Sequence, residues 1–287
     1  KGAGILKCHY CDMSAPIPDI CPKCQSCHIK PIGIGTEQLE EETRKILSVG
    51  ANGRSSLHAR VARMDKDTTT KKRSHHKILD AVLQGDVDVL VGTQMVAKGH
   101  HFPDVTLVGI VSADTSINIP DFRSSERTFQ LITQAAGRAG RGNVPGEVIV
   151  QTFNPGHLCL KWAAEQNYEA FFEEELNNRK ELFYPPFSRL ALIRFEGNKE
   201  ADVEAVAKKA KRFADSLPDN DFKKSVAVFG PAPAFFSKLK GKYRWQMLLK
   251  GKNVKPLHEF IASLLKEFEK RPDKVKLVVD IDPATTI

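Results

Sequence analysis

The sequence predicts an α/β protein with a parallel-sheet domain followed by a smaller α+β domain. Short apolar runs at residues 87–91 and 105–111 are bounded by polar turns, as in buried parallel strands. Helical patterns alternate with such runs up to residue 156, which indicates a sheet covered on both faces. Beyond Tyr184-Pro185-Pro186 the order becomes β-α-β-β-α-β, which is typical of a ferredoxin-like sandwich.

We expect four regions along the chain. They are a partial Cys-rich zinc-binding region over 1–34, a parallel-sheet domain over 35–156, a helical connector over 157–186 and a ferredoxin-like domain over 187–287. In the parallel-sheet domain the patterns predict strands over 59–64, 87–91, 105–111 and 147–152, and helices over 38–47, 71–83 and 125–139, with Thr36 as an N-cap. In the last domain they predict strands over 190–195, 226–230, 244–249 and 275–281, and helices over 201–217 and 254–270.

The charge of the chain is concentrated at its C-terminal end. Residues 1–186 hold 22 basic and 22 acidic side chains, whereas residues 187–287 hold 21 and 13, which accounts for the whole formal charge of +8. A basic excess of this size favours a polyanionic partner such as nucleic acid. No apolar run reaches the roughly 18 residues of a membrane span.

Five of the six cysteines lie between residues 8 and 27. Two Cys-x-x-Cys pairs, Cys8/Cys11 and Cys21/Cys24, have the spacing of a zinc–thiolate site. Cys27 and His28 are spare donors. Clustering at one end of a large chain favours metal in a reducing compartment over disulfides, so we expect a cytoplasmic protein. The chain begins without Met and reaches the first cysteine within seven residues, so we expect it to be part of a longer protein.

The segment from Gln134 to Arg141 reads QAAGRAGR. Arg138 and Arg141 lie three residues apart at the end of a predicted helix, so we expect both guanidinium groups on one helical face. Glycine before each arginine leaves room for a ligand. A pair of permanent cations that can each form bidentate hydrogen bonds suits a polyphosphate.

A second motif, TQMVAKGHHFPD, follows the apolar run at 87–91 directly. A loop at the carboxyl end of a parallel strand lies where such sheets bind ligands. The residues that we expect to contact phosphates or to shape this loop are Thr93, Gln94, Lys98 and Gly99.

These two motifs resemble the fifth and last conserved motifs of superfamily 2 helicases. The wording TQMVAKGHHFPDVTLVG, with GTEQLE at 35–40, DFRSSER at 121–127 and GEVIVQT at 146–152, is similar to the PriA (primosomal protein N′) family of bacterial replication-restart DNA helicases. The resemblance implies that residues 35–156 form the second RecA-like lobe. Arg138 and Arg141 would stabilise the γ-phosphate of ATP held with Mg²⁺ by another lobe, and Gln134 would either position them or contact the γ-phosphate.

The resemblance also implies the cofactors and partners of the whole protein. The family holds two zinc ions with four Cys-x-x-Cys pairs, of which Cys8/Cys11 and Cys21/Cys24 match the third and fourth and serve different ions. Three alternatives follow for this chain: the four cysteines bind one ion together, bind none, or require the two upstream pairs. Its partners are forked and single-stranded DNA, the single-stranded DNA-binding protein, primosome proteins and the replicative helicase, in the bacterial cytoplasm with the nucleoid. The sequence contains no G-x-x-x-x-G-K-[ST] and no D-E-x-H, so we expect half of an ATPase site and no hydrolysis by this chain alone.

The stretch 238–255 is basic, contains no acidic residue and has aromatic residues in or beside it. Cations with aromatic rings suit single-stranded nucleic acid, although the same pattern fits a soluble edge strand whose aromatics enter the core. The candidate DNA-binding residues are Lys238, Lys240, Lys242, Tyr243, Arg244 and Trp245. Two alternatives remain: a non-enzymatic zinc-ribbon adaptor that binds nucleic acid, and a different superfamily 2 translocase.

Overall fold

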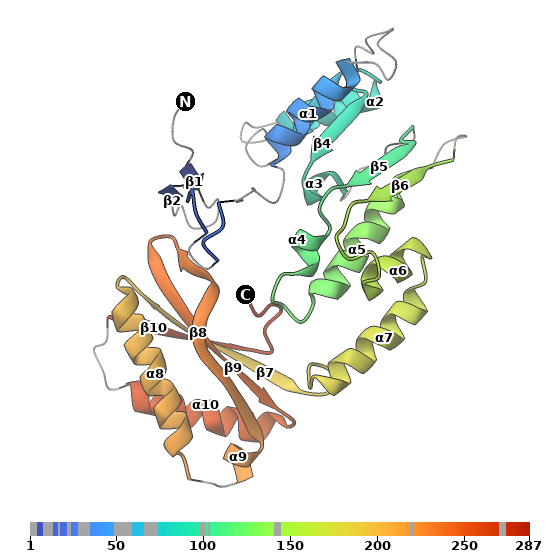
Figure 1. Cartoon of the computed structure of the whole chain (residues 1–287). Coiled ribbons are helices and arrows are strands. Elements are labelled where there is room, and N and C mark those ends of the chain that lie inside the picture. The colour runs from blue at the N-terminus through green and yellow to red at the C-terminus, as the bar shows by residue number, and fades with distance from the viewer. Residues whose placement is uncertain are drawn as a thin grey trace. The chain divides into compact units, whose positions relative to one another are not determined.

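The computed structural model describes residues 5–7, 14–16, 18–21, 24–27, 35–48, 59–65, 74–97, 102, 104–140, 145–218, 221–269 and 274–287. The chain forms two compact units. The central unit comprises Pro31–Ile119 and Ser124–Phe171, and the C-terminal unit comprises Phe172–Ile287 together with Lys1–Lys30 and Pro120–Arg123. Figure 1 shows the elements of each.

The central unit contains two pairs of parallel strands. β3 (Val61–Met64) pairs with β4 (Val89–Gly92), and β5 (Leu107–Ile110) pairs with β6 (Glu147–Val150). Helices α1 (Thr36–Ser48), α2 (Ser74–Leu83), α3 (Gln94–Ala97), α4 (Asp114–Ile117) and α5 (Ser124–Ala136) alternate with these strands. The predicted α/β alternation is therefore present, with strands shorter than predicted.

Thr36 does not cap α1 in the predicted way. It is the first helical residue, and its hydroxyl donates a hydrogen bond to Asp65 Oδ2 at 2.6 Å. The prediction was wrong because a tertiary acceptor takes the hydroxyl that sequence alone assigns to the helix N-terminus.

Two small cores stabilise the central unit. One contains Met64, Leu79 and Phe102, and the other forms where α5 packs against α6 (Leu158–Ala164) and the start of α7 (Tyr168–Glu181). Phe129 stacks on Phe171 with ring centroids 4.2 Å apart. Because these apolar side chains complete the core, residues 157–171 of the predicted connector pack with the central unit.

The C-terminal unit contains a four-stranded antiparallel sheet. Its strands are β7 (Arg189–Gly197), β8 (Val226–Leu239), β9 (Lys242–Gly251) and β10 (Val275–Ile281), in the order β10-β7-β9-β8. The helices α8 (Glu200–Ser216) and α10 (Val254–Glu269) pack against this sheet (Figure 1), and α9 (Asp221–Lys224) precedes β8. The core between helices and sheet includes Phe195, Met247 and Phe260, each 0% exposed.

The hairpin between β8 and β9 is longer than the sequence patterns predict. β8 continues past Gly230 to Leu239, although Pro231 and Pro233 lie within it. Proline is tolerated because β8 is an edge strand with register irregularities on both sides of this region. The strands meet at a two-residue turn in which Lys240 and Gly241 have φ of 49° and 79°, as in a type I′ hairpin.

Near the N-terminus, β1 (Ile5–Lys7) and β2 (Ser14–Pro16) form an antiparallel pair. Among the described residues, no helix has the length and apolar character required to cross a membrane.

Candidate functional site

The first predicted site loop begins at the carboxyl end of β4. Gly92 lies opposite Met64 of β3, and a Cβ on Gly92 would lie 2.5 Å from the carbonyl oxygen of Met64 and 2.3 Å from Val96. Only glycine fits here, so strand and following turn pack closely. Thr93 and Gln94 are exposed immediately after this strand, which leaves both side chains accessible to a ligand. Lys98 and Gly99 lie outside the described residues.

An ion-pair cluster fixes the neighbouring strand end. Asp65 follows β3 and is 5% exposed. Arg63 Nε lies 3.4 Å from its carboxylate and 3.5 Å from that of Glu40 on α1. These contacts hold α1 against the same sheet edge that carries Thr93.

The QAAGRAGR segment enters a turn earlier than predicted. α5 ends at Ala136, and Arg138 N donates to Ala135 O at 3.0 Å in the turn that follows. The prediction that two arginines share one helical face was therefore wrong for Arg138, which lies beyond the helix. Gln134 is exposed on the last turn of α5, Arg138 is half-buried, and Arg141 lies outside the described residues.

The backbone conformation and packing at position 140 require glycine. Its φ is +72°, and a Cβ there would lie 2.6 Å from Gly146 N. A left-handed backbone and a close main-chain approach both require glycine. The second glycine of the motif thus serves the turn, whereas the sequence argument assigned it to ligand access.

The structure brings the two predicted motifs together. α3 contacts α5, and Gly140 N donates a hydrogen bond to Val105 O at 3.0 Å. The turn after α5 is therefore anchored to the segment that follows the β4 loop. The two motifs therefore lie on neighbouring elements of the central unit.

In the C-terminal unit, basic residues surround the β8–β9 turn. Lys240 and Lys242 are exposed, and Lys238 Nζ lies 3.4 Å from the hydroxyl of Tyr243 and 4.6 Å from the centroid of its ring. Phe235, 48% exposed, lies on the same hairpin. The hairpin end therefore presents cations and an aromatic ring to solvent.

The remaining predicted DNA-binding residues point elsewhere. Arg244 is 6% exposed, with Nε 3.4 Å from Glu196 Oε1. Burial, followed by the charge of Arg194, lowers its pKa, and Glu196 opposes the shift. Tyr243 and Trp245 alternate with Arg244 along β9 and pack against the core below α8 and α10. Strand alternation thus turns these aromatic residues toward the core.

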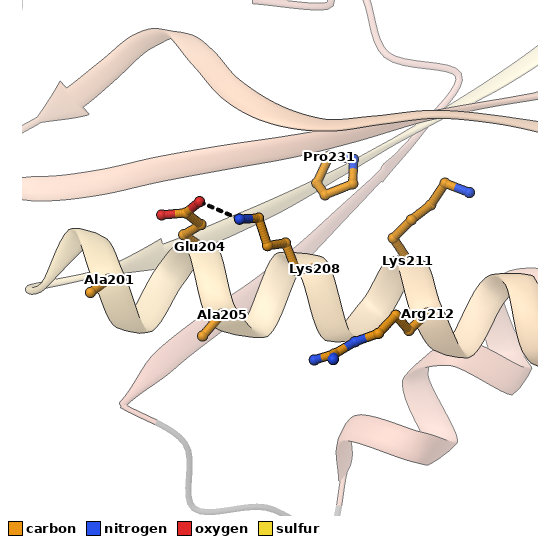
Figure 2. A pocket seen from close by; sticks show the side chains of 7 residues that line it. All are labelled: Ala201, Glu204, Ala205, Lys208, Lys211, Arg212 and Pro231. Atoms are coloured by element: carbon orange, nitrogen blue, oxygen red, sulfur yellow. Dashed lines mark ion pairs between the residues drawn. The ribbon is translucent and has the colours of Figure 1, made fainter.

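A second basic surface, which the sequence reasoning missed, lies on α8. Lys208, Lys211 and Arg212 line a groove of about 610 Å³ that Pro231 of β8 closes on one side (Figure 2). Lys208 pairs with Glu204 at 2.6 Å, and Lys211 pairs with Asp215. The acidic residues lie one helical turn from these lysines, so the sequence shows no basic run here, and in the structure they offset the positive charge. The hairpin is therefore the stronger candidate interface.

The cysteines are only partly described. Cys21 is half-buried and Cys24 is exposed, and Gln25 N donates a hydrogen bond to Cys21 O at 2.9 Å. Cys8 and Cys11 lie outside the described residues, between β1 and β2 in the sequence. Within the described part of the chain, no group of three His, Cys, Asp or Glu residues could hold a metal ion.

Comparison with known families defines the class of protein. Residues 35–143 match the helicase conserved C-terminal domain, and residues 180–284 match the C-terminal domain of primosomal protein N. The chain therefore combines a region similar to a helicase C-terminal domain with a region similar to the C-terminal domain of primosomal protein N.

The similarity to one protein extends along almost the whole chain. The chain is 41% identical to the replication restart protein PriA of Bacillus subtilis over 96% of its own length and 33% of the relative. It is 38% identical to PriA of Synechocystis over 99% and 32%, and 37% identical to PriA of Haemophilus influenzae over 97% and 36%. The resemblance to the PriA family is thus confirmed, and the chain spans about a third of the length of these relatives. A non-enzymatic adaptor is not favoured.

Proposed function

We propose that this chain is the C-terminal part of an ATP-dependent 3′–5′ DNA helicase that restarts replication at stalled or abandoned forks by primosome assembly. The observation that carries the proposal is the presence, on one chain, of a helicase C-terminal domain and a PriA C-terminal domain. Similarity along 96–99% of the chain to proteins named replication restart protein PriA supports it.

In this proposal the central unit is the second RecA-like lobe. Its parallel strand pairs and the meeting of the β4 loop with the turn after α5 support that role. Arg138 and Arg141 stabilise the charge that develops on the γ-phosphate of Mg²⁺-bound ATP, and Gln134 positions them. The β4 loop links nucleotide state to the grip on DNA through Thr93, Gln94, Lys98 and Gly99.

The C-terminal unit is a ferredoxin-like DNA-binding domain in this proposal. Its β-α-β-β-α-β order and the sheet order β10-β7-β9-β8 support the fold. Lys238, Lys240 and Lys242 follow the phosphates, and Phe235 stacks on a base. The single-stranded DNA-binding protein, primosome proteins and the replicative helicase are the further partners, in the bacterial cytoplasm with the nucleoid.

We further propose that Cys8, Cys11, Cys21 and Cys24 bind zinc, in the whole protein as part of a two-ion arrangement. The Cys-x-x-Cys spacing, the hydrogen bond from Gln25 N to Cys21 O and the pure thiol donor set fit a tetrahedral zinc–thiolate site. Bound zinc would supply structural stabilisation to this short, Pro-rich region.

The test compares the 287-residue chain with a chain extended upstream through a P-loop lobe. DNA-stimulated ATP hydrolysis is expected only from the extended chain, because the P-loop and acidic motifs are missing from these 287 residues. Both chains are expected to bind forked DNA. Robust turnover by the 287-residue chain, or no DNA-stimulated turnover by the extended one, would contradict the proposal.

A further inference from the structure

A short segment between α4 and α5 belongs to the C-terminal unit. Pro120–Arg123 clusters with Phe172–Ile287, whereas the residues before and after it, Ile119 and Ser124, belong to the central unit. The chain therefore leaves the central unit for four residues, contacts the C-terminal unit, and starts α5 at the next residue. The proposed roles in ATP hydrolysis and DNA binding do not involve the DFR sequence at 121–123.

Asp121 is the hydrogen-bonding centre of this segment. Its carboxylate is 6% exposed; Oδ1 accepts from Arg123 N at 2.8 Å, and Oδ2 accepts from Thr286 N at 2.9 Å and from the hydroxyl of Thr285. A buried carboxylate needs such donors, because an unsatisfied charge is costly away from water. One side chain thus shapes the entry to α5 and also holds a segment about 164 positions away in the sequence.

The held segment, Ala284–Ile287, is tied to the C-terminal sheet as well. Gln246 Nε2 on β9 donates to Thr286 O at 3.4 Å, and Arg123 Nη1 lies 3.5 Å from Ala284 O. Thr286 is 7% exposed. The segment therefore connects Asp121 to the strand whose other end carries Lys242.

Phe122 makes a separate contact with the same sheet. Its ring stacks on Tyr184 at 5.4 Å with an interplanar angle of 6°. On β9, Lys250 Nζ lies 3.3 Å from the Tyr184 ring centroid and donates to Leu182 O at 3.1 Å. Burial raises the pKa of Tyr184 and lowers that of Lys250. Through Tyr184, a ring-stacking contact and a cation–π contact thus connect Phe122 to Lys250 on β9.

We propose that Asp121 and Phe122 are positioning residues that couple the DNA-binding domain to the turn after α5, which carries Arg138. β9 carries Lys242 of the basic hairpin at one end, and its Gln246 and Lys250 contact Thr286 and Tyr184, the residues that Asp121 and Phe122 bind. Ser124, the first residue of α5, follows this segment directly, Gln134 lies on the last turn of that helix, and Arg138 lies in the turn after it. Because Ser124 follows Arg123 in the chain, a displacement of the 120–123 segment on DNA binding would be passed to the first residue of α5. The inference rests on the proposed helicase function.

The experiment uses the full-length helicase and measures basal ATPase, DNA-stimulated ATPase and DNA affinity. Asp121→Asn, Thr285→Val and Phe122→Leu are the variants, and Asp202→Asn, an exposed carboxylate on α8, is the matched control. We expect basal turnover and DNA affinity close to wild type in all of them. DNA stimulation should fall about fivefold or more in the three variants and stay unchanged in the control, a loss within the usual range of coupling energies.

The double variant Asp121→Asn/Thr285→Val adds a check that a merely structural role would not satisfy. Since the two substitutions share the hydrogen bond between Thr285 and Asp121, the loss of stimulation in the double variant should be smaller than the sum of the losses in the singles. Unchanged stimulation, or an equal fall of basal turnover and stimulation, would overturn the coupling. Absence of DNA stimulation in the wild type would instead overturn the proposed function, so the two failures are distinguishable.

Discussion

The two units of this chain differ in the length of their strands and in the size of their hydrophobic cores. The sheet of the C-terminal unit has four strands of seven to fourteen residues and a core in which fourteen of the described residues are buried. In the central unit, the described strands have four residues each, and its two cores hold seven and three buried residues among those described. The comparison indicates that the C-terminal unit has a complete core of its own, whereas the central unit places its candidate site residues in turns over smaller cores.

The largest expected effect comes from truncating the larger core. Phe260→Ala should destabilise the C-terminal unit by about 3–5 kcal/mol, and Met64→Ala should cost the central unit about 2–3 kcal/mol because a smaller cluster collapses more easily. Each unit holds one tryptophan, Trp245 and Trp162. Urea unfolding of single-tryptophan variants reports each unit by itself. Equal shifts of both transitions by either substitution would contradict independent cores.

A smaller effect is expected at the buried ion pair of β7 and β9. Glu196→Ala removes the acidic partner of Arg244, which is 6% exposed. Leaving a buried guanidinium without this partner should cost about 2–3 kcal/mol in urea unfolding. The exposed pair Lys208–Glu204 is the control, where Glu204→Ala should cost less than about 1 kcal/mol. Similar costs for the two substitutions would mean that Arg244 is not effectively buried.

The pH dependence of the C-terminal unit should include a contribution from Lys250. Burial lowers its pKa below the usual 10.5. Between the lowered value and 10.5 the unfolded chain binds the proton more tightly than the folded one, so stability rises with pH in that window. Urea midpoints of wild type and Lys250→Met, compared from neutral pH to about pH 10, should show a smaller rise in the variant. A parallel rise in both proteins would exclude Lys250 as the source.

The smallest effect, and the opposite end of the pH scale, is expected in the central unit. Hydrogen bonds from the Arg60 side chain and main chain lower the pKa of Asp88 from 3.8 to about 2. The pair therefore stabilises the folded state above pH 3.8, and this stabilisation is lost as pH falls toward 2. Because the pair is exposed, Asp88→Asn should change the urea midpoint slightly at neutral pH and not at all at the acidic end. A difference that persists in acid would contradict this assignment.

The sequence predicts much of the fold because local patterns agree with the final packing. The β-α-β-β-α-β order beyond residue 187 follows from apolar spacing alone. Pro231 and Pro233 concealed the length of β8, since only the edge position of that strand makes them tolerable. The end of α5 was missed because Gly140 is fixed by its approach to Gly146, which no local pattern shows.

The sequence predicts the exposure of candidate site residues at the ends of strands and helices. It does not predict the surroundings of residues whose contacts come from distant parts of the chain. Thr93, Gln94 and Gln134 lie exposed at the predicted places. Arg244 is buried beside Glu196, and Trp245 packs on the core, which is the alternative that the sequence left open for the aromatic residues of this stretch. The partners of Asp121 lie more than 160 positions away in the sequence, so its contacts could not be read from the DFR sequence.

Measuring ATP turnover and DNA affinity in the full-length protein tests most directly whether the QAAGRAGR segment serves ATP and the β8–β9 hairpin serves DNA. Arg141→Ala should reduce ATP turnover by about a hundredfold or more while leaving DNA affinity within a few-fold. Lys240→Glu with Lys242→Glu should weaken DNA binding and reduce its log–log salt slope by about two, with turnover retained at saturating DNA. Equal loss of turnover and DNA affinity in both variants would contradict the division of labour between the two units.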